Sequence, residues 1–266
     1  MRTTVESQKV GIRLHSSYTS FAFCTTVRRG HSVVVLGGDV GGGKSTHAGL
    51  LVWYFRQRCG IGARYAHVKS FHALSRALFL LLLLLRYRSR LVLRACRSFS
   101  PFRILYEHDR ELLVKTFAVV SLLNFLDLAV IALARQRLLG AFTRVLVFED
   151  HVVGYANDAT YFFYVLGGRM NRWSRAVWLM GLFYLLGLLR GQSAVFFLRA
   201  PFSELARRWR ERGTPYEYAE YLLAGRAAAR LLERMGLKIT YVDTSKPLPK
   251  VFAKILCSLK EALETY

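Results

Sequence analysis

Acidic residues are scarce in this sequence: 17 Asp and Glu stand against 39 Lys and Arg, which gives a formal net charge of +22. Lysine is scarce too, at nine residues, so arginine carries most of the positive charge. An excess of this size fits a polyanionic partner such as nucleotide phosphates, nucleic acid or an anionic membrane. A bias towards arginine codons on a solvated surface explains it equally well. Charge alone therefore does not select the partner.

Cysteine is rare and scattered, at Cys24, Cys59, Cys96 and Cys257. The four residues form no Cys-x-x-Cys pair, and no histidine lies near them at metal-ligand spacing, so structural zinc is not expected. The pattern predicts free thiols in a reducing compartment, which places the protein in the cytoplasm.

No apolar run is long and clean enough to predict a membrane-spanning helix, which needs about 20 apolar residues. Residues 77–85 are too short, and residues 176–189 end before an arginine. The run 116–134 is interrupted by Asn124 and Asp127. These runs are better explained as core helices that flank a sheet, so a membrane partner is not favoured.

The chain length of 266 residues suits one α/β domain with a large buried core. Hydrophobic residues make up 53 % of the chain, which excludes a disordered protein. Residues 1–30 are rich in Ser and Thr, and their basic residues are opposed only by Glu6. We treat 1–30 as a basic N-terminal extension without fixed structure, for which a transit peptide and a mis-assigned start codon are further explanations. The predicted domain is 31–266.

Strand-like apolar runs alternate with runs of helical periodicity from residue 31 onward. The predicted strands cover 31–37, 63–68, 144–148, 194–198 and 238–242. The predicted helices cover 44–58, 71–96, 109–137, 157–189 with a break at Gly167-Gly168, 202–212, 216–235 and 251–263. Such alternation predicts an α/β fold of three layers, in which helices cover both faces of a parallel sheet of about five strands.

Residues 38–46, which we call the phosphate loop, read Gly-Asp-Val-Gly-Gly-Gly-Lys-Ser-Thr directly after the first predicted strand. Gly38, four further residues and then Gly43-Lys44-Ser45 fill the Walker A pattern. Glycines let backbone amides converge on phosphate oxygens, and the following helix points its positive dipole end at the anion. The residues predicted to bind ATP are Gly38, Gly41, Gly42, Gly43, Lys44, Ser45 and Thr46.

Two side chains of the phosphate loop have predicted chemical roles. Lys44 is a catalytic residue that reaches the β- and γ-phosphates, and the Ser45 hydroxyl is a ligand for Mg²⁺. The strand before the loop and the helix after it are the context that the motif requires. Together with the strand–helix alternation, they predict a P-loop NTPase fold.

A second candidate is Glu149-Asp150, at the end of the third predicted strand. Strand ends of a doubly wound sheet lie at the ligand crevice, beside the phosphate loop. A carboxylate there orients the hydration shell of Mg²⁺ or accepts a proton from the acceptor, and we favour Glu149 over Asp150 for this catalytic and metal-binding role. An ordinary acidic cap on the next helix is the alternative. His151 is assigned no role beyond supporting these two carboxylates.

A third candidate is the arginine-rich helix that contains Arg207, Arg208, Arg210 and Arg212. A phosphoryl group in transfer needs cations that close over it, so this helix and the Gly-Thr-Pro turn after it form a candidate lid. A solvated basic face is the alternative. Helical spacing puts Arg208 and Arg212 on one face, whereas Glu211 is spaced to pair with Arg207. Arg208 and Arg212 are therefore the predicted catalytic arginines.

The order of phosphate loop, long helical insertion, acidic strand end and arginine-rich helix resembles the thymidylate kinase family, and is most similar to its divergent archaeal members. The resemblance runs from about residue 31 to the C-terminus. It implies a kinase that uses ATP and Mg²⁺, with the loop and lid arginines serving ATP and a triplet after a strand holding a monophosphate substrate. That triplet aligns with Glu149-Asp150-His151.

Two positions depart from the family pattern. Val40 stands where an acidic residue is usual, and Asp39 lies one place early. Asp150 stands where the triplet has a phosphate-binding arginine. At Val40 and Gly41 the loop is also similar to that of deoxynucleoside kinases. Both departures concern the acceptor and leave ATP binding untouched.

The sequence therefore predicts an enzyme that transfers phosphate from ATP to a nucleoside monophosphate, with a homodimer as an allowed assembly. Two alternatives stay open. One is a P-loop ATPase or nucleotide-binding module acting on nucleic acid, which rests on the net charge but is not favoured because no second helicase-type motif is evident. The other is a kinase relative that binds ATP without transfer, which the Asp150 substitution keeps open.

Overall fold

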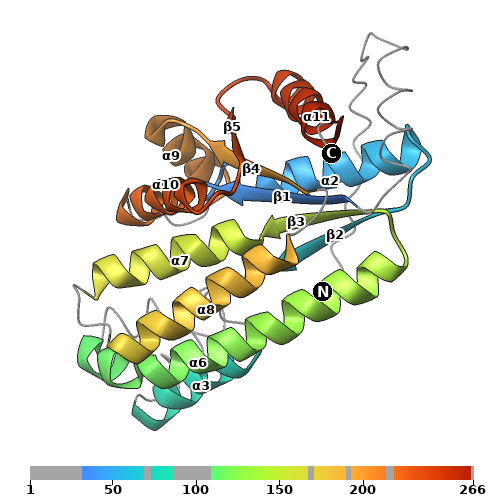
Figure 1. Cartoon of the computed structure of the whole chain (residues 1–266). Helices are drawn as coiled ribbons and strands as arrows, with labels where there is room; N and C mark the ends of the chain where they lie inside the picture. The colour runs from blue at the N-terminus through green and yellow to red at the C-terminus, as the bar shows by residue number, and fades with distance from the viewer. Residues whose placement is uncertain are drawn as a thin grey trace.

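Five parallel strands form one sheet in the order β2-β3-β1-β4-β5 (Figure 1). The computed structural model describes residues 32–68, 73–86, 109–166, 171–189, 193–213 and 219–264. The strands are β1 (Ser32–Gly38), β2 (Ala63–Val68), β3 (Val145–Asp150), β4 (Ser193–Arg199) and β5 (Ile239–Asp243). All five predicted strands and the α/β class are confirmed. The predicted extension 1–30 and the helical positions 87–96 lie outside the described residues.

Helices cover both faces of the sheet, as the buried strands require. On one face lie α2 (Lys44–Gln57) and α11 (Leu248–Glu264), which share an apolar cluster with β1, β3 and β4. On the other face, α7 (His151–Val165) and α10 (Ala219–Arg234) pack together against the sheet. The outer part of that side holds α3 (Ala73–Arg86), α6 (Arg110–Ala134), the π-helical turn η1 (Arg135–Leu139) and α8 (Arg172–Leu188). The remaining helix, α9 (Phe202–Glu211), follows β4.

Helix α6 begins where the sequence predicts, because the Asp109 carboxylate accepts a hydrogen bond of 2.9 Å from the Leu112 amide. By length and composition alone, Arg110–Leu139 is apolar enough to cross a membrane, although 39 % of its most apolar window is buried within the protein. The two polar residues within its apolar run, Asn124 and Asp127, are buried. The buried Asp127 carboxylate accepts the amides of Leu74 and Ser75 at 2.9 Å each, which ties α3 to α6.

The cysteines differ from the prediction at one position. Cys257 is a free, exposed thiol. Cys59 is disulfide-bonded, so the prediction of free thiols is wrong there. Cys24 and Cys96 lie outside the described residues.

The turn from β1 into the phosphate loop requires glycine at residue 38. Gly38 has a φ of +127°, and a Cβ there would lie 2.1 Å from the Leu198 carbonyl oxygen of the neighbouring strand. We expect Gly38→Ala to lower the free energy of unfolding by roughly 2–4 kcal/mol, because backbone strain adds to the overlap. Denaturant titration measures this loss. Gly49→Ala on α2 is the matched control, because nothing beyond the local helix backbone lies within 4 Å of its added Cβ, and it should be neutral or stabilising.

Candidate active site

The phosphate loop joins the carboxyl end of β1 to the first turn of α2, near the middle of the sheet. Gly41 and Gly43 have φ values of +84° and +85°, and the buried Gly42 donates its amide to the Asp39 carbonyl at 2.9 Å. Ser45 and Thr46 are exposed in the first turn of α2. Within this described turn, no acidic residue and no capping side chain competes for the free backbone amides. The loop is therefore built to receive an anion.

Lys44 folds back over the phosphate loop. Its Nζ donates to the carbonyl oxygens of Gly38 at 3.1 Å and Asp39 at 3.3 Å. The same ammonium lies 3.6 Å from Oδ1 of Asp150, and only 10 % of the lysine side chain is exposed. A single cation thus connects the loop with the end of β3.

Glu149 faces the same loop from β3. Its Oε1 accepts a hydrogen bond of 3.0 Å from the Ser45 hydroxyl, and its Oε2 accepts one of 2.6 Å from the Tyr65 hydroxyl. Burial and the bond to Glu149 raise the pKa of Tyr65, so the phenol stays protonated and donating at physiological pH. Tyr65 fixes the orientation of the carboxylate and leaves its other oxygen towards Ser45.

Asp150 also turns towards the loop, through an unusual backbone. Asp150 and His151 have φ values of +68° and +42°, the only described non-glycine residues with positive φ. Asp150 packs so closely on Gly154 that a Cβ there would lie 2.5 Å from the aspartate Cβ. Its Oδ2 lies 3.0 Å from Nε2 of His67 on β2. Strained backbone of this kind persists where the surrounding structure enforces it, commonly at functional sites.

His151 lies behind this group and is fully buried against the Phe148 ring, with ring centroids 4.9 Å apart. Burial lowers its pKa to about 3, so the imidazole is neutral at physiological pH. The supporting role that the sequence analysis allows for His151 stays a prediction.

The donor atoms at the strand ends fit a magnesium ion. The Ser45 hydroxyl and the Glu149 carboxylate converge at 3.0 Å, and hard oxygen donors are what Mg²⁺ prefers. Donor atoms of His67, Glu149 and Asp150 all lie within 4.8 Å of one another. Ser45 and Glu149 are the metal ligands that the sequence analysis predicts, and this role stays a prediction.

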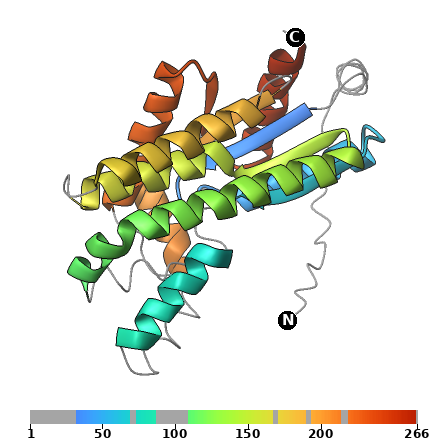
Figure 2. The same ribbon diagram turned by 60° about the horizontal axis from the view of Figure 1, so that its bottom comes forward.

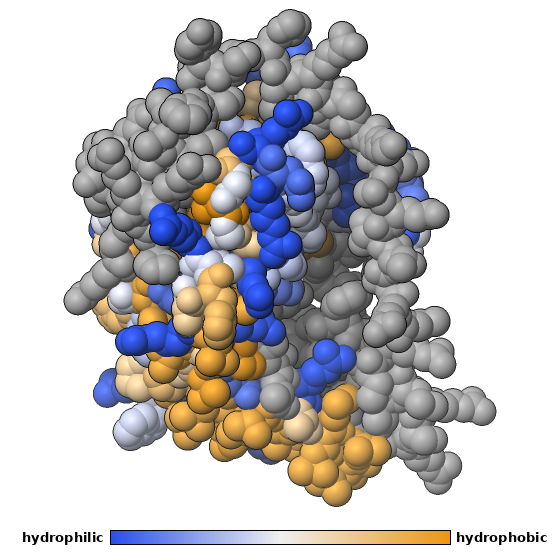
Figure 3. Space-filling model, turned by 90° about the vertical axis from the view of Figure 1, so that its right-hand side faces the viewer, coloured by the Kyte–Doolittle hydropathy of each residue, from blue (hydrophilic) through white to orange (hydrophobic). Residues whose placement is uncertain are grey.

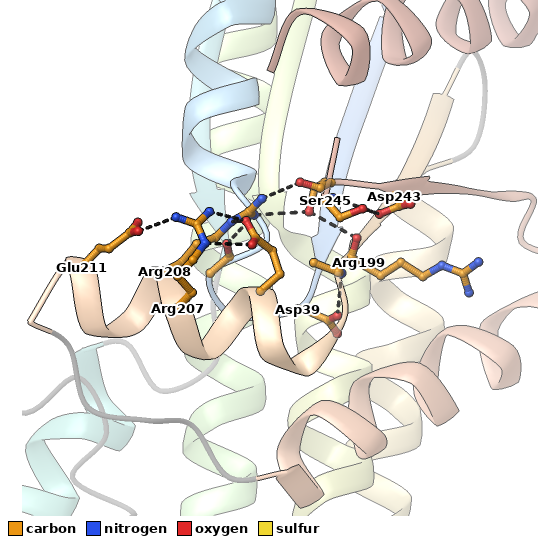
Figure 4. A network of polar contacts seen from close by, with 11 residues as sticks. Asp39, Arg199, Arg207, Arg208, Glu211, Asp243 and Ser245 are labelled. Atoms are coloured by element: carbon orange, nitrogen blue, oxygen red, sulfur yellow. Dashed lines mark hydrogen bonds and ion pairs between the residues drawn. The ribbon is translucent and has the colours of Figure 1, made fainter. Parts of the chain in front are cut away.

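Helix α9 sits beside the phosphate loop, and its arginines have different surroundings (Figure 4). Arg207 pairs with Glu204 and, as its spacing predicts, with Glu211. Arg208 donates to the Gly41 carbonyl at 3.1 Å, to Thr244 after β5, and to Glu204 at 2.8 Å. The bonds from Arg207 and Arg208 lower the pKa of Glu204 to about 2, so it stays ionised.

Arg210 and Arg212 lie exposed at the end of α9, and within the described part of the chain neither has a contact to the loop that would assign it a role. The two predicted catalytic arginines are therefore placed differently. Arg208 is anchored at the loop, whereas Arg212 reaches solvent. Of these two arginines, Arg208 is the one that is bonded to the phosphate loop.

Asp39 and Val40 of the phosphate loop make different kinds of contact. The buried Asp39 carboxylate accepts 2.9 and 3.3 Å bonds from Arg226 of α10 and from the Ala200 amide. Val40 packs on an apolar cluster that includes Leu205 of α9. The Asp39 carboxylate therefore links the phosphate loop to α10. Its ion pair with Arg226 explains why an acidic residue stands at this position.

Sequence reasoning missed Tyr65 and His67 on β2 and Arg226 on α10. The parallel register of β2 and β3 pairs His67 with Glu149, and this register brings both β2 side chains to the acidic pair. The available signal was the spacing of Tyr65 and His67, which are two residues apart in the predicted strand and therefore on one face of it. Arg226 lies 187 residues from Asp39, and no local pattern connects them.

Comparison with known proteins shows no family for this chain. No protein-family model matches the chain, and no curated protein matches it in sequence. Among solved structures, deoxyadenosine kinase from M. mycoides with bound dCTP matches at 14 % identity and a TM-score of 0.49, over 86 % of this chain and 99 % of that one. The same enzyme with bound dATP matches at 14 % identity and a TM-score of 0.48, over 85 % and 98 %. Likenesses at this level do not bear on what the chain acts on, and the resemblance to thymidylate kinases stays a prediction.

The anchored arginine gives a testable expectation. The Arg208 guanidinium of α9 donates to the carbonyl oxygens of both Gly41 and Thr244, and Arg208→Ala removes these bonds. We expect nucleotide-dependent turnover to fall roughly 10- to 100-fold, because small misplacements of a loop that positions phosphates are costly. Steady-state kinetics with ATP varied measures this. Arg210→Ala, an exposed arginine of the same helix, should change little, and equal losses in both variants would contradict the anchoring role.

Proposed function

We propose that the chain is a kinase that transfers phosphate from ATP, with Mg²⁺, to a nucleoside or nucleoside monophosphate. The monophosphate is the acceptor that the thymidylate kinase resemblance implies. The observation that carries the proposal is the convergence of Ser45 and Glu149 at 3.0 Å beside Lys44 and an uncapped helix start. A phosphate loop with a metal-binding hydroxyl and a facing carboxylate has the parts that phosphoryl transfer requires.

Each residue has a defined task in this proposal. Bound Mg²⁺–ATP supplies the phosphoryl group and part of the positive charge that stabilises its transfer. The loop amides and Lys44 would hold the phosphate oxygens, while Ser45 and Glu149 would hold the metal ion. Tyr65 keeps Glu149 in place through its 2.6 Å bond.

The proton of an acceptor hydroxyl needs a base at the strand ends. Glu149 is bonded to Ser45 and Tyr65, and Asp150 is held by His67 at 3.0 Å and by Lys44 at 3.6 Å. We keep Glu149 as the proposed base, as the sequence analysis favours, with Asp150 as the alternative. We propose the exposed Arg212, which follows α9, as a second cation for the transferring phosphate, with Arg208 holding the loop. A cytoplasmic location, where ATP and such acceptors are available, fits the same proposal.

Charge at the strand ends bears on the acceptor. Asp150 occupies the position where the resembled family holds a monophosphate with arginine, and it lies next to the second carboxylate, Glu149. Two carboxylates repel a monophosphate dianion unless cations offset them. This arrangement supports an uncharged nucleoside hydroxyl over a monophosphate.

A second candidate is a kinase relative that binds ATP without transfer. The specific observation in its favour is the ion pair between Lys44 and Asp150 at 3.6 Å, because a lysine held by a carboxylate is less available to a phosphate. The two candidates share a binding site and differ in turnover.

The proposal is tested by incubating the protein with ATP, Mg²⁺ and a panel of nucleosides and nucleoside monophosphates, with chromatography of the products. We expect one acceptor class to gain a phosphate, with nucleosides ahead of monophosphates. Binding of ATP with no product from any acceptor would support the second candidate. Hydrolysis stimulated by nucleic acid in a salt-sensitive way would instead support a nucleic-acid ATPase.

A further inference from the structure

Helix α3 exposes leucines and buries a serine. The exposed side chains, which we call the leucine face, are Leu74, Leu81, Leu84 and Leu85. They are exposed by 50–77 %, although the sequence analysis expects the run 77–85 in the core. Ser75 of the same helix is fully buried, and its amide and hydroxyl both donate to the Asp127 carboxylate of α6. Polar groups inside and apolar groups outside are the reverse of a water-facing helix and the arrangement of helices that contact lipid.

The leucine face lies at the periphery of the molecule. Figure 2 shows α3 beyond α6 and away from the sheet, and Figure 3 shows hydrophobic residues gathered at the lower end, where Figure 1 places both helices. Phe79 fixes the other side of α3 in the core that α6 shares. With 14 residues, α3 is about 21 Å long and too short to span a bilayer, so a lipid contact here runs along the membrane surface.

Positive charge is concentrated in the part of the sequence that contains α3. Residues 40–106 include 12 Lys and Arg and no Asp or Glu, so they supply more than half of the net charge of +22. A bias towards arginine codons explains the preference for Arg over Lys, but it does not explain the absence of acidic residues from this segment. The segment therefore favours an anionic partner.

An anionic lipid surface matches both features. The leucine face presents an apolar area on the order of 400 Å², half of the ~800 Å² that each partner contributes to a standard protein interface, so it is small for a protein partner. A nucleic acid matches the charge but offers no apolar surface for the leucines. In an anionic membrane, the acyl chains receive apolar side chains while the headgroups attract Lys and Arg, and the two attractions add.

We propose that α3 docks the protein on an anionic membrane surface, with the leucine face below the headgroups and the helix axis parallel to the membrane. The amides of Leu74 and Ser75 are already held by Asp127 at 2.9 Å each, so the start of the helix is fixed before any lipid arrives. A preformed helix avoids the ordering cost that a free amphipathic peptide has on binding.

This docking does not depend on the proposed function, because the phosphate loop lies at the sheet and not on α3. A failure of catalysis would leave membrane binding unaffected. A protein that binds no vesicles would leave the proposed chemistry unaffected.

Co-flotation of the full chain with lipid vesicles tests the inference. We expect binding to vesicles of phosphatidylglycerol and phosphatidylcholine, and at least about tenfold weaker binding to phosphatidylcholine alone. Leu85→Glu should lower the affinity roughly 100-fold, because it places a charge at the most exposed position of the leucine face, and the uncharged Leu85→Gln should lower it less. Leu223→Glu on α10, a leucine exposed by 64 %, is the matched control and should bind normally. Circular dichroism checks that the variants remain folded.

Charge reversal at the end of α3 tests the electrostatic part. Arg86→Glu, at the last residue of α3, should weaken binding to the anionic vesicles roughly tenfold. Arg234→Glu, at the exposed last residue of α10, changes the net charge by the same amount and should have a much smaller effect. Equal losses in the two variants would show that total charge, and not α3, governs binding, and would overturn the docking site.

Three further results would overturn the inference. The first is no flotation with either vesicle, or flotation that tolerates Leu85→Glu. The second is equal binding to neutral and anionic vesicles, which would remove the anionic surface as the partner. The third comes from sedimentation velocity without lipid: an assembly that Leu85→Glu dissociates would show that the leucine face binds protein instead.

Discussion

Replacing Lys44 by alanine is expected to lower the rate of phosphoryl transfer at least about a thousandfold. The lysine ammonium is the only described cation that touches both the phosphate loop carbonyls and the acidic end of β3. When phosphate oxygens displace the Gly38 and Asp39 carbonyls, this charge meets the negative charge of the transferring group. Its removal leaves that charge uncompensated in a partly buried site, where electrostatic terms are large.

The measurement is transfer of labelled γ-phosphate under single-turnover conditions, beside ATP binding at equilibrium. Lys254→Ala, an exposed lysine of α11, is the control for loss of charge alone and should behave like the unaltered protein. Transfer by the Lys44 variant within tenfold of the unaltered protein would remove Lys44 from the chemistry. Loss of the fold is monitored by thermal denaturation of both variants.

Replacing Glu149 by glutamine is expected to lower the maximal rate roughly 100- to 10 000-fold and to raise the Mg²⁺ concentration needed for half the rate. Glutamine has nearly the same shape, so the bond from Tyr65 persists at one oxygen. The negative charge that would hold the metal ion with Ser45 is lost. A change in charge without a change in shape therefore separates metal binding from packing.

The Mg²⁺ dependence of the rate distinguishes a role of Glu149 as a metal ligand from a role as a proton acceptor. Glu211→Gln, at an exposed carboxylate that pairs with Arg207 on α9, is the matched control and should shift neither quantity. An unchanged Mg²⁺ requirement with a lowered rate would point to Glu149 as a proton acceptor and not as a metal partner. An unchanged rate would remove it from the site.

Much of the fold follows from local patterns in the sequence. The phosphate loop follows directly after the strand Val33-Val34-Val35-Leu36. Because strand and loop are adjacent in sequence and in space, one short segment is enough to predict both. The pairing of Arg207 with Glu211 follows from helical spacing alone. Such features need no knowledge of distant residues.

Other parts depend on contacts between distant segments. The register between β2 and β3 decides that His67 lies opposite Glu149, and sequence spacing does not encode it. Helix α7 begins at His151, six residues before the predicted start, because the positive φ values of Asp150 and His151 turn the chain directly from strand to helix. The Asp150 side chain does not cap the helix, so no local sequence pattern predicts that α7 begins at His151.

The fate of the γ-phosphate tests the central claim most directly. ATP labelled at the γ-position is incubated with the protein, Mg²⁺ and a nucleoside acceptor, and the label is followed into the products. The account predicts label in the phosphorylated acceptor, with a requirement for Mg²⁺ and none formed by the Lys44→Ala variant. Label recovered only as inorganic phosphate, or only as unchanged ATP that remains bound, would contradict a kinase.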